Sequence, residues 1–75
     1  MKIKKMKINK IKIYDSFIEK APGDRKMARR WRYYRETGEL YVPIVINKEG
    51  YLVDGYTSYI IAMADGLKKY EVIIN

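Results

Sequence analysis

The chain has 75 residues, of which 48% are hydrophobic, and it carries a formal net charge of +7. This length predicts a single domain over residues 1–75, near the lower limit at which a hydrophobic core stabilises a fold unaided. The chain contains no cysteine and no histidine. Disulfides and thiol chemistry are therefore excluded, and the usual general base and imidazole metal ligand are missing. We predict no metal site.

No stretch of the sequence approaches the roughly 18 consecutive apolar residues that would span a bilayer. The lysines near the N-terminus are not followed by an apolar stretch with a small-residue cleavage site, so a signal peptide is not expected. Together with the lack of cysteine, these features predict a cytoplasmic protein.

The charge is divided unevenly along the chain. Residues 1–35 contain thirteen Lys and Arg against three acidic residues, a net +10, whereas residues 36–75 contain three Lys against six acidic residues, a net −3. This asymmetry predicts a polyanionic partner, with nucleic acid first and an anionic membrane surface second.

Residues 1–14 alternate lysine with Ile or Met, which is typical of a strand with one buried face. The phase of the alternation slips, because Ile3 has an odd number, Met6 and Ile8 even numbers, and Ile11 an odd number again. Each slip sends the apolar side chains to the opposite face. The pattern therefore predicts either two short strands bent at Asn9-Lys10 or one strand with a bulge.

The next segment, 15–23, is predicted to be a connector that Phe17 and Ile18 anchor to the core. A helix is expected to begin with Asp24 as its N-cap and to run to about Glu36, before Thr37-Gly38.

At 100° per residue, one face of this helix carries Met27, Trp31 and Tyr34, which predicts a buried stripe. The opposite face carries a cluster of basic side chains.

In the second half, predicted turns separate short elements, and the central turn is a sharp one at Asp54-Gly55. Pro43–Ile46 is wholly apolar, which is typical of a strand buried on both faces. A turn at 47–50 and a return strand at 51–53 follow. After the sharp turn we expect a helix that Thr57 or Ser58 caps and that runs to Gly66, Leu67 beneath the helix end, and a last strand at 70–74.

This order of elements, with the residues Pro43-Ile44-Val45-Ile46, Tyr51-Leu52-Val53-Asp54-Gly55 and Gly66-Leu67, resembles the ParB/sulfiredoxin-like fold, and most closely the ParB N-terminal domain with its small stand-alone relatives. The resemblance implies an α+β (mixed α/β) class, with a small mixed sheet of about four strands and two main helices.

In ParB proteins the glycine of this turn is followed by Glu-Arg-Arg and further arginines, which hold a nucleotide triphosphate. Here the glycine is followed by Tyr56-Thr57-Ser58-Tyr59, without a basic residue, so CTP hydrolysis and CTP gating are not expected. In sulfiredoxins the residue after the glycine is the catalytic cysteine; Tyr56 in this place excludes peroxiredoxin repair.

The turn is a candidate phosphate site, because the amides at a helix N-terminus face anions. Its members would be Gly55, Tyr56, Thr57 and Ser58. The alternative is that Gly55 only supplies a backbone shape and the hydroxyls are ordinary caps. No cofactor is predicted, and a nucleotide is the one group left open.

The basic helix is the candidate nucleic-acid surface. Its cationic residues could grip phosphates while its aromatic residues stack on bases. The alternatives are a solvated basic face and aromatic side chains in the core, and the core is the favoured place for the aromatics. The N-terminal lysines add charge of the same sign nearby in sequence. The predicted contact residues are Arg25, Lys26, Arg29, Arg30, Arg32 and Arg35, interleaved with Trp31, Tyr33 and Tyr34.

The sequence therefore predicts a non-enzymatic ParB-like module that binds nucleic acid, DNA before RNA, in a partition, mobile-element or phage accessory role. One alternative is a protein-interaction or regulatory module that binds an acidic partner or forms a homodimer. Another is a nucleotide-phosphate binder at Gly55. No motif supports nuclease, kinase or CTPase activity, because the carboxylates Asp15, Asp24 and Asp54 are scattered.

Overall fold

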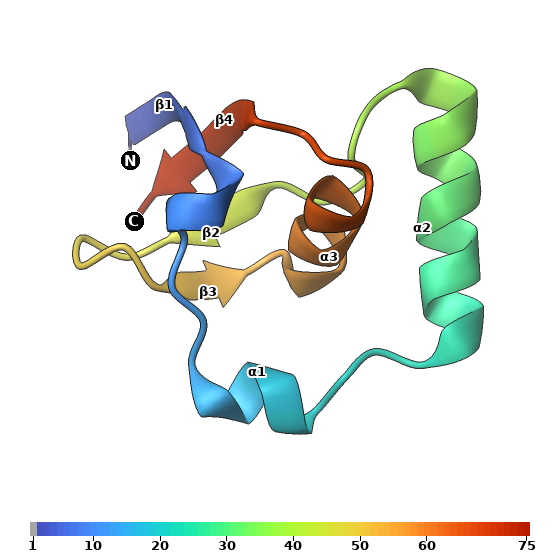
Figure 1. Cartoon of the computed structure of the whole chain (residues 1–75), viewed down its shortest axis with the longest axis horizontal. Coiled ribbons are helices and arrows are strands. Elements are labelled where there is room, and N and C mark those ends of the chain that lie inside the picture. Colours follow the sequence, from blue (N-terminus) through green and yellow to red (C-terminus); the bar gives the residue numbers. More distant parts are fainter. Residues whose placement is uncertain (1) are drawn as a thin grey trace.

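A four-stranded mixed sheet carries the fold of the computed structural model, which describes residues 2–75 (Figure 1). The strands lie in the order β1-β4-β2-β3. Strand β4 is antiparallel to β1 and parallel to β2, and β3 is antiparallel to β2. The strands are β1 (Lys2–Lys7), β2 (Ile44–Ile46), β3 (Leu52–Asp54) and β4 (Lys69–Ile74).

Three α-helices and one turn of 3₁₀ helix complete the described chain, which confirms the predicted α+β class with a mixed sheet of four strands. The helices are η1 (Ile8–Lys10), α1 (Asp15–Glu19), α2 (Asp24–Thr37) and α3 (Tyr56–Ala64). Within residues 2–75, none of the helices has the length and apolar character needed to cross a membrane.

The core lies between α3, η1 and one face of the sheet. Alternation places Ile44 and Ile46 of β2 on this face, where both are buried. Val45, between them, remains partly exposed on the opposite face, so the prediction that this strand is buried on both faces was wrong. The core residues are Ile8, Ile11, Ile44, Ile46, Leu52, Ile61, Ala62 and Val72.

The N-terminal segment bends at Asn9-Lys10, as in the two-strand alternative, but its second extended piece forms an isolated bridge rather than a strand. The turn η1 includes Asn9-Lys10 and separates β1 from an isolated bridge in which Lys12 pairs in parallel with Tyr51. The turn allows Ile8 and Ile11 both to point into the core, with exposures of 0% and 5%. The slip in the alternation is therefore produced by a helical turn between two extended pieces.

The predicted connector 15–23 contains the short helix α1, which the sequence did not indicate. Phe17 is half-buried, and its ring lies 5.3 Å from that of Tyr56 between centroids, so it anchors the segment as expected. Ile18 is 60% exposed, and its prediction as an anchor was wrong. The cause is the helical turn, because adjacent residues of a helix point about 100° apart.

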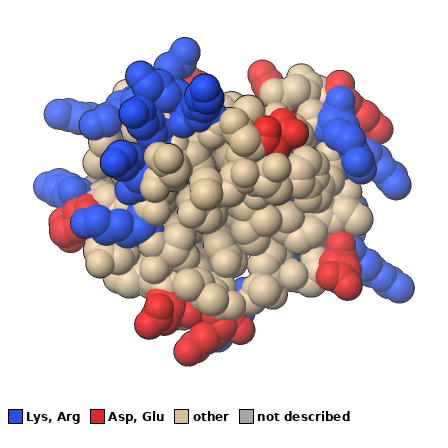
Figure 2. Space-filling model, viewed as in Figure 1, with Lys and Arg blue, Asp and Glu red and all other residues tan. Residues whose placement is uncertain are grey.

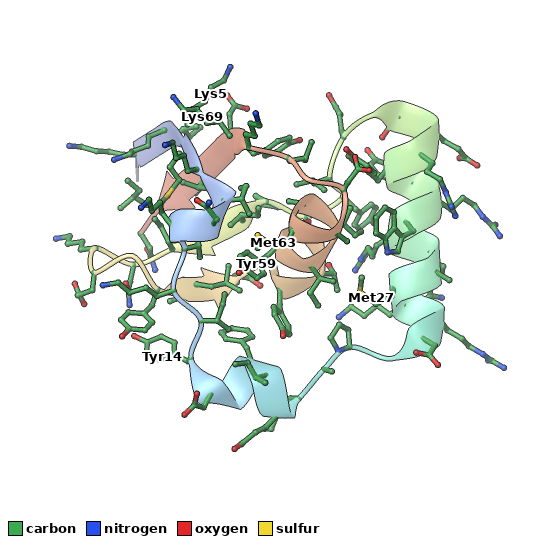
Figure 3. The ribbon with its side chains drawn as sticks, in the orientation of Figure 1. Lys5, Tyr14, Met27, Tyr59, Met63 and Lys69 are labelled. Carbon is green, nitrogen blue, oxygen red and sulfur yellow. The ribbon has the colours of Figure 1, made fainter. Side chains whose placement is uncertain are left out.

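Helix α2 has the predicted extent, but Gly23 is its N-cap and Asp24 its first residue, without a side-chain cap. It ends at Gly38, which has a φ of +76° in the left-handed region and donates its amide to the carbonyl of Tyr34. The predicted inner stripe, Met27 with Trp31 and Tyr34, is half-buried, and Met27 points toward the rest of the molecule (Figure 3).

Helix α3 begins differently from the prediction. Its N-cap is Gly55, and neither Thr57 nor Ser58 caps it, because both lie inside the first turn and are buried. Its last helical residue is Ala64, and the amide of Leu67 donates to the carbonyl of Ala62. Leu67 is half-buried against the core beneath the helix end, as predicted.

Candidate functional site

The turn that starts α3 is built on a close approach of two backbone segments. Gly55 has a φ of +83°, in the left-handed region that favours glycine. A Cβ added here would lie 2.1 Å from the carbonyl oxygen of Pro43 and 3.0 Å from the Cα of Ile44. No side chain fits this space, so glycine is required both by the dihedral angle and by the contact with the start of β2.

The first turn of α3 presents backbone amides at the end of a nine-residue helix. Helix geometry leaves the first amides without intrahelical acceptors, and the dipole makes this end attractive to anions. The amide of Gly55 is already used, because it donates to Oδ1 of Asp54 at 2.8 Å. The hydroxyl of Ser58 is also used, because it donates to the carbonyl of Val42 at 2.5 Å. Of the predicted phosphate set, Gly55, Tyr56 and Thr57 line the adjoining cleft, and Ser58 does not.

This cleft, of ≈ 430 Å³, lies between the start of α3 and the segment formed by α1, the linker after it and α2, which surrounds α3 in Figure 1. Three cationic residues line it, and Asp54 is its one acidic lining residue among those described. The lining residues are Ser16, Phe17, Lys20, Pro22, Lys26, Arg30, Val42, Asp54, Gly55, Tyr56 and Thr57. The cleft therefore places positive side chains opposite the positive end of a helix.

Of the three cations, Arg30 is the most firmly held. Its guanidinium lies 4.1 Å from the centre of the Tyr41 ring, and the face of an aromatic ring attracts cations. Its Nε is buried and has no hydrogen-bond partner among the described residues. Lys20 and Lys26 are exposed and reach the cleft from α1's end and from α2.

The six cations predicted as one nucleic-acid surface are divided by the helix that carries them. Lys26 and Arg30 are four residues apart and lie on the flank that lines the cleft. At 100° per residue the outer face carries the exposed Arg25, Arg29 and Arg32, and the exposed Arg35 lies beside it. The predicted single cationic surface is therefore divided into two groups, one lining the cleft and one on the outer side of α2.

The N-terminal lysines form a third group, remote from α2. Figure 2 shows basic side chains gathered over the end of the molecule where β1 and β4 lie, and others at the opposite end over α2, with mainly uncharged surface and some acidic side chains between. Lys5 and Lys69, labelled in Figure 3, mark the first end, and Met27 marks the second. The lysines are therefore near the arginines in sequence but not in space.

The aromatic side chains of α2 are used in packing. Trp31 and Tyr34 meet edge to face at 6.1 Å, and Tyr33 meets Tyr41 in the same way at 5.0 Å. The hydroxyl of Tyr34 donates to Oδ2 of Asp65 at 2.6 Å, and this hydrogen bond raises the pKa of Tyr34 above its ordinary value of 10.0. Trp31, Tyr33 and Tyr34 are therefore half-buried and packed against other aromatic rings, but they lie outside the buried core.

The carboxylates remain as scattered in space as in sequence. Residues 2–75 contain no group of three or more acidic side chains that could hold a metal ion. The cations that line the cleft and the amides at the start of α3 make the cleft electrostatically favourable for an anion.

No protein-family model matches the sequence, and no curated protein matches it. Two solved structures of a pNOB8-like ParB N-domain do match, with TM-scores of 0.80 and 0.79. Each covers 97% of this chain at 23% sequence identity. This chain has the fold of a ParB N-terminal domain.

The likeness to the ParB N-domain spans nearly the whole chain, so it includes the cleft, α2 and the lysine-rich strand β1. The chain spans only 29% and 26% of the lengths of the two matched proteins. At this identity the comparison shows the ParB N-domain fold, and the function is argued from the residues of this chain.

Sequence reasoning did not single out Lys20 and grouped Lys26 and Arg30 with the outer arginines, whereas the structure places all three in the lining of the cleft. The cationic residues that face the start of α3 come from positions about 25–35 residues before Gly55 in the chain. No local motif links these positions, because the fold alone brings α1 and α2 to the start of α3.

Proposed function

We propose that this ParB-like module binds the phosphate groups of a nucleotide in the cleft at the start of α3, without catalysing a reaction. The observation that carries the proposal is the arrangement of Lys20, Lys26 and Arg30 around the first turn of a helix that begins at a side-chain-free Gly55. The ParB N-domain fold is compatible with a partition-related role for such a module.

The physical terms in the cleft favour an anion. Amides of Tyr56 and Thr57 lie at the positive end of the helix dipole, and phosphate bound in this position is stabilised by both charge and hydrogen bonds. The cleft volume of ≈ 430 Å³ lies within the range of about 300–1,000 Å³ for small-molecule sites. The rings of Phe17 and Tyr56 supply an apolar wall for a base. Asp54 opposes the anion and limits the affinity.

Titration of the labelled protein with CTP, ATP and inorganic phosphate, followed by NMR, tests the proposal. We expect the amide signals of Tyr56 and Thr57 to shift, and those of β1 to remain in place. Unchanged signals of α3 at millimolar nucleotide would contradict the proposal.

A matched pair of double variants separates the cleft from the general charge. Lys20→Ala with Lys26→Ala removes two cleft cations, and Arg25→Ala with Arg29→Ala removes two cations from the outer face of the same region. The first pair should weaken nucleotide binding about tenfold, because each close charge–phosphate contact contributes about 0.5–1 kcal/mol or more. If both double variants lose the same nucleotide affinity, the binding depends on the net charge of the protein and not on the cleft.

The second candidate is DNA binding by the outer face of α2, and the exposed row of arginines favours it. Arg25, Arg29, Arg32 and Arg35 are all exposed, on a helix at one edge of the molecule (Figure 1). An α-helix fits the major groove of B-DNA, which is about 12 Å wide. Glu36 lies among these arginines on the outer face and reduces their attraction for phosphates.

Mobility-shift assays at several salt concentrations test this second candidate. Four phosphate contacts predict a slope of about −3.6 for log affinity against log salt. Changing Arg25, Arg29 and Arg32 to Ala should abolish most of the binding, whereas the same change at Lys2, Lys4 and Lys5 should not. Binding that depends on the lysines alone, or that ignores salt, would exclude α2 as the DNA surface.

A further inference from the structure

A second hollow lies at the other end of the molecule, apart from the nucleotide cleft. It occupies ≈ 600 Å³ between the end of β1 with η1 and the segment that joins α3 to β4. Met63 and Lys69, both labelled in Figure 3, belong to its lining. The lining residues are Lys7, Asn9, Met63, Gly66, Leu67, Lys68 and Lys69. We call this hollow the lysine groove.

The charge of the lysine groove is uncompensated within its own lining. Its seven lining residues include three lysines and no carboxylate. In the antiparallel register of β1 and β4, Lys7 lies directly opposite Lys69, whereas two residues along the strands, on the same face, Lys5 lies opposite Glu71. Like charges in directly opposite positions destabilise a strand pair, and opposite charges stabilise it. The sheet thus has a repulsive pair at the groove and a favourable pair two residues away.

The groove also has an apolar part. Met63 is 45% exposed on α3, and Leu67 is half-buried beside it. A methionine side chain adapts its shape to an incoming group, and exposed methionines are frequent on surfaces that bind peptides. The groove therefore combines cations with an adaptable apolar wall. The phosphate backbone of a nucleic acid would match the cations but not the apolar wall.

We propose that the lysine groove binds an acidic peptide segment that carries an apolar side chain. Aspartate or glutamate side chains of the peptide relieve the repulsion between Lys7 and Lys69, and one leucine-sized side chain covers Met63 and Leu67. Charge complementarity identifies this partner, because the groove offers three ammonium groups and the peptide supplies the missing carboxylates. The site and its ligand are distinct from those of the nucleotide cleft.

NMR titration of the full chain with a synthetic Asp/Glu-rich decapeptide that contains one leucine tests the proposal. We expect the signals of Gly66, Leu67 and Lys68 to shift, and those of Tyr56 and Thr57 to remain in place. The control peptide has Asn and Gln in place of Asp and Glu and should not bind. An oligothymidylate that shifts the same signals as strongly would assign the groove to nucleic acid and overturn the proposal, as would self-association of the chain through this face.

Two double variants give a readout that a merely structural role would not produce. Lys7→Gln with Lys69→Gln should weaken peptide binding about tenfold, and Lys4→Gln with Lys48→Gln, an equal loss of charge outside the groove, by less than about threefold. The first pair should also raise the midpoint of thermal unfolding, because it removes a repulsion. Equal binding losses in the two pairs, or a lower midpoint in the first, would overturn the proposal, since the lysines would then serve only the net charge or the dipole of α3.

Discussion

The substitution Gly55→Ala measures the close approach on which the cleft is built. It introduces a Cβ where the dihedral angle is left-handed and where the carbonyl oxygen of Pro43 would lie 2.1 Å away. Gly38→Ala is the matched control, because Gly38 has nearly the same φ, +76°, and nothing within 4 Å of the added atom. Both changes lower the entropy of the unfolded chain equally, so this term cancels in the comparison.

The two costs can be worked out separately. Forcing alanine into the left-handed region costs about 1–2 kcal/mol, and this applies to both variants. A contact at 2.1 Å requires the backbone of Pro43 or of α3 to move, and overpacking of this kind costs a further ~1–3 kcal/mol. Gly55→Ala should therefore lose about 2–5 kcal/mol, out of a total of roughly 4–11 kcal/mol for a domain of this length.

Urea unfolding followed by circular dichroism gives both free energies of unfolding. The expected result is that Gly55→Ala loses about 1–3 kcal/mol more than Gly38→Ala, and that thermal midpoints fall by about 4–8 °C for each kcal/mol. Equal losses in the two variants would refute the reasoning, because the left-handed dihedral angle alone would then explain the glycine and the backbone segments would not be in contact.

Four further substitutions test the surroundings of the cleft and the tyrosines. Ser58→Ala should lower the free energy of unfolding by about 1–3 kcal/mol in urea melts, because it leaves the carbonyl of Val42 without its buried donor. Burial raises the pKa of Tyr59 in the folded state above the unfolded value of 10.0. The stability that this shift contributes is therefore complete below pH 10.0 and is lost as the pH rises through the pKa of the folded state. Tyr59→Phe should reduce this loss of stability at alkaline pH, measured by urea melts at and above pH 10. Tyr34→Phe should remove one late-ionising tyrosine from the ultraviolet titration, and Asp65→Asn should instead move that ionisation to lower pH, because the hydrogen bond from Tyr34 to Asp65 raises the pKa of the tyrosine.

Features whose signals are local were predicted well. The end of α2 at Gly38 and the sharp turn before α3 both depend on a glycine with positive φ, and the sequence marks such positions clearly. The slip of phase near Asn9 likewise indicated a bend, and the structure supplies the 3₁₀ turn. The cap of α3 was assigned wrongly, since hydroxyl residues near a helix start resemble caps even when Gly55 already fills that position.

Features that depend on the path of the chain through space were not predictable. Phe17 and Ile18 are both large and apolar. A helix of five residues is too short to show a periodicity that would predict which of them points inward. The grouping of Lys20 with Arg30 and the start of α3 depends on how the linker after α1 directs α2. Equally, the distance between the N-terminal lysines and α2 follows from the sheet, where β1 lies at one edge.

The position of β4 has a consequence for synthesis of the protein. This strand, formed by residues 69–74, lies inside the sheet between β1 and β2, and Lys2 pairs with Ile74. Contacts between residues so far apart in sequence slow folding, because a long loop must close before they form. Until residues 69–74 have been synthesised, β1 therefore has no partner strand, and β2 is paired with β3 alone, so that its other edge is open. Lysines on an unpaired strand oppose edge-to-edge pairing between chains, so we expect the lysines of β1 to limit aggregation of the incomplete chain.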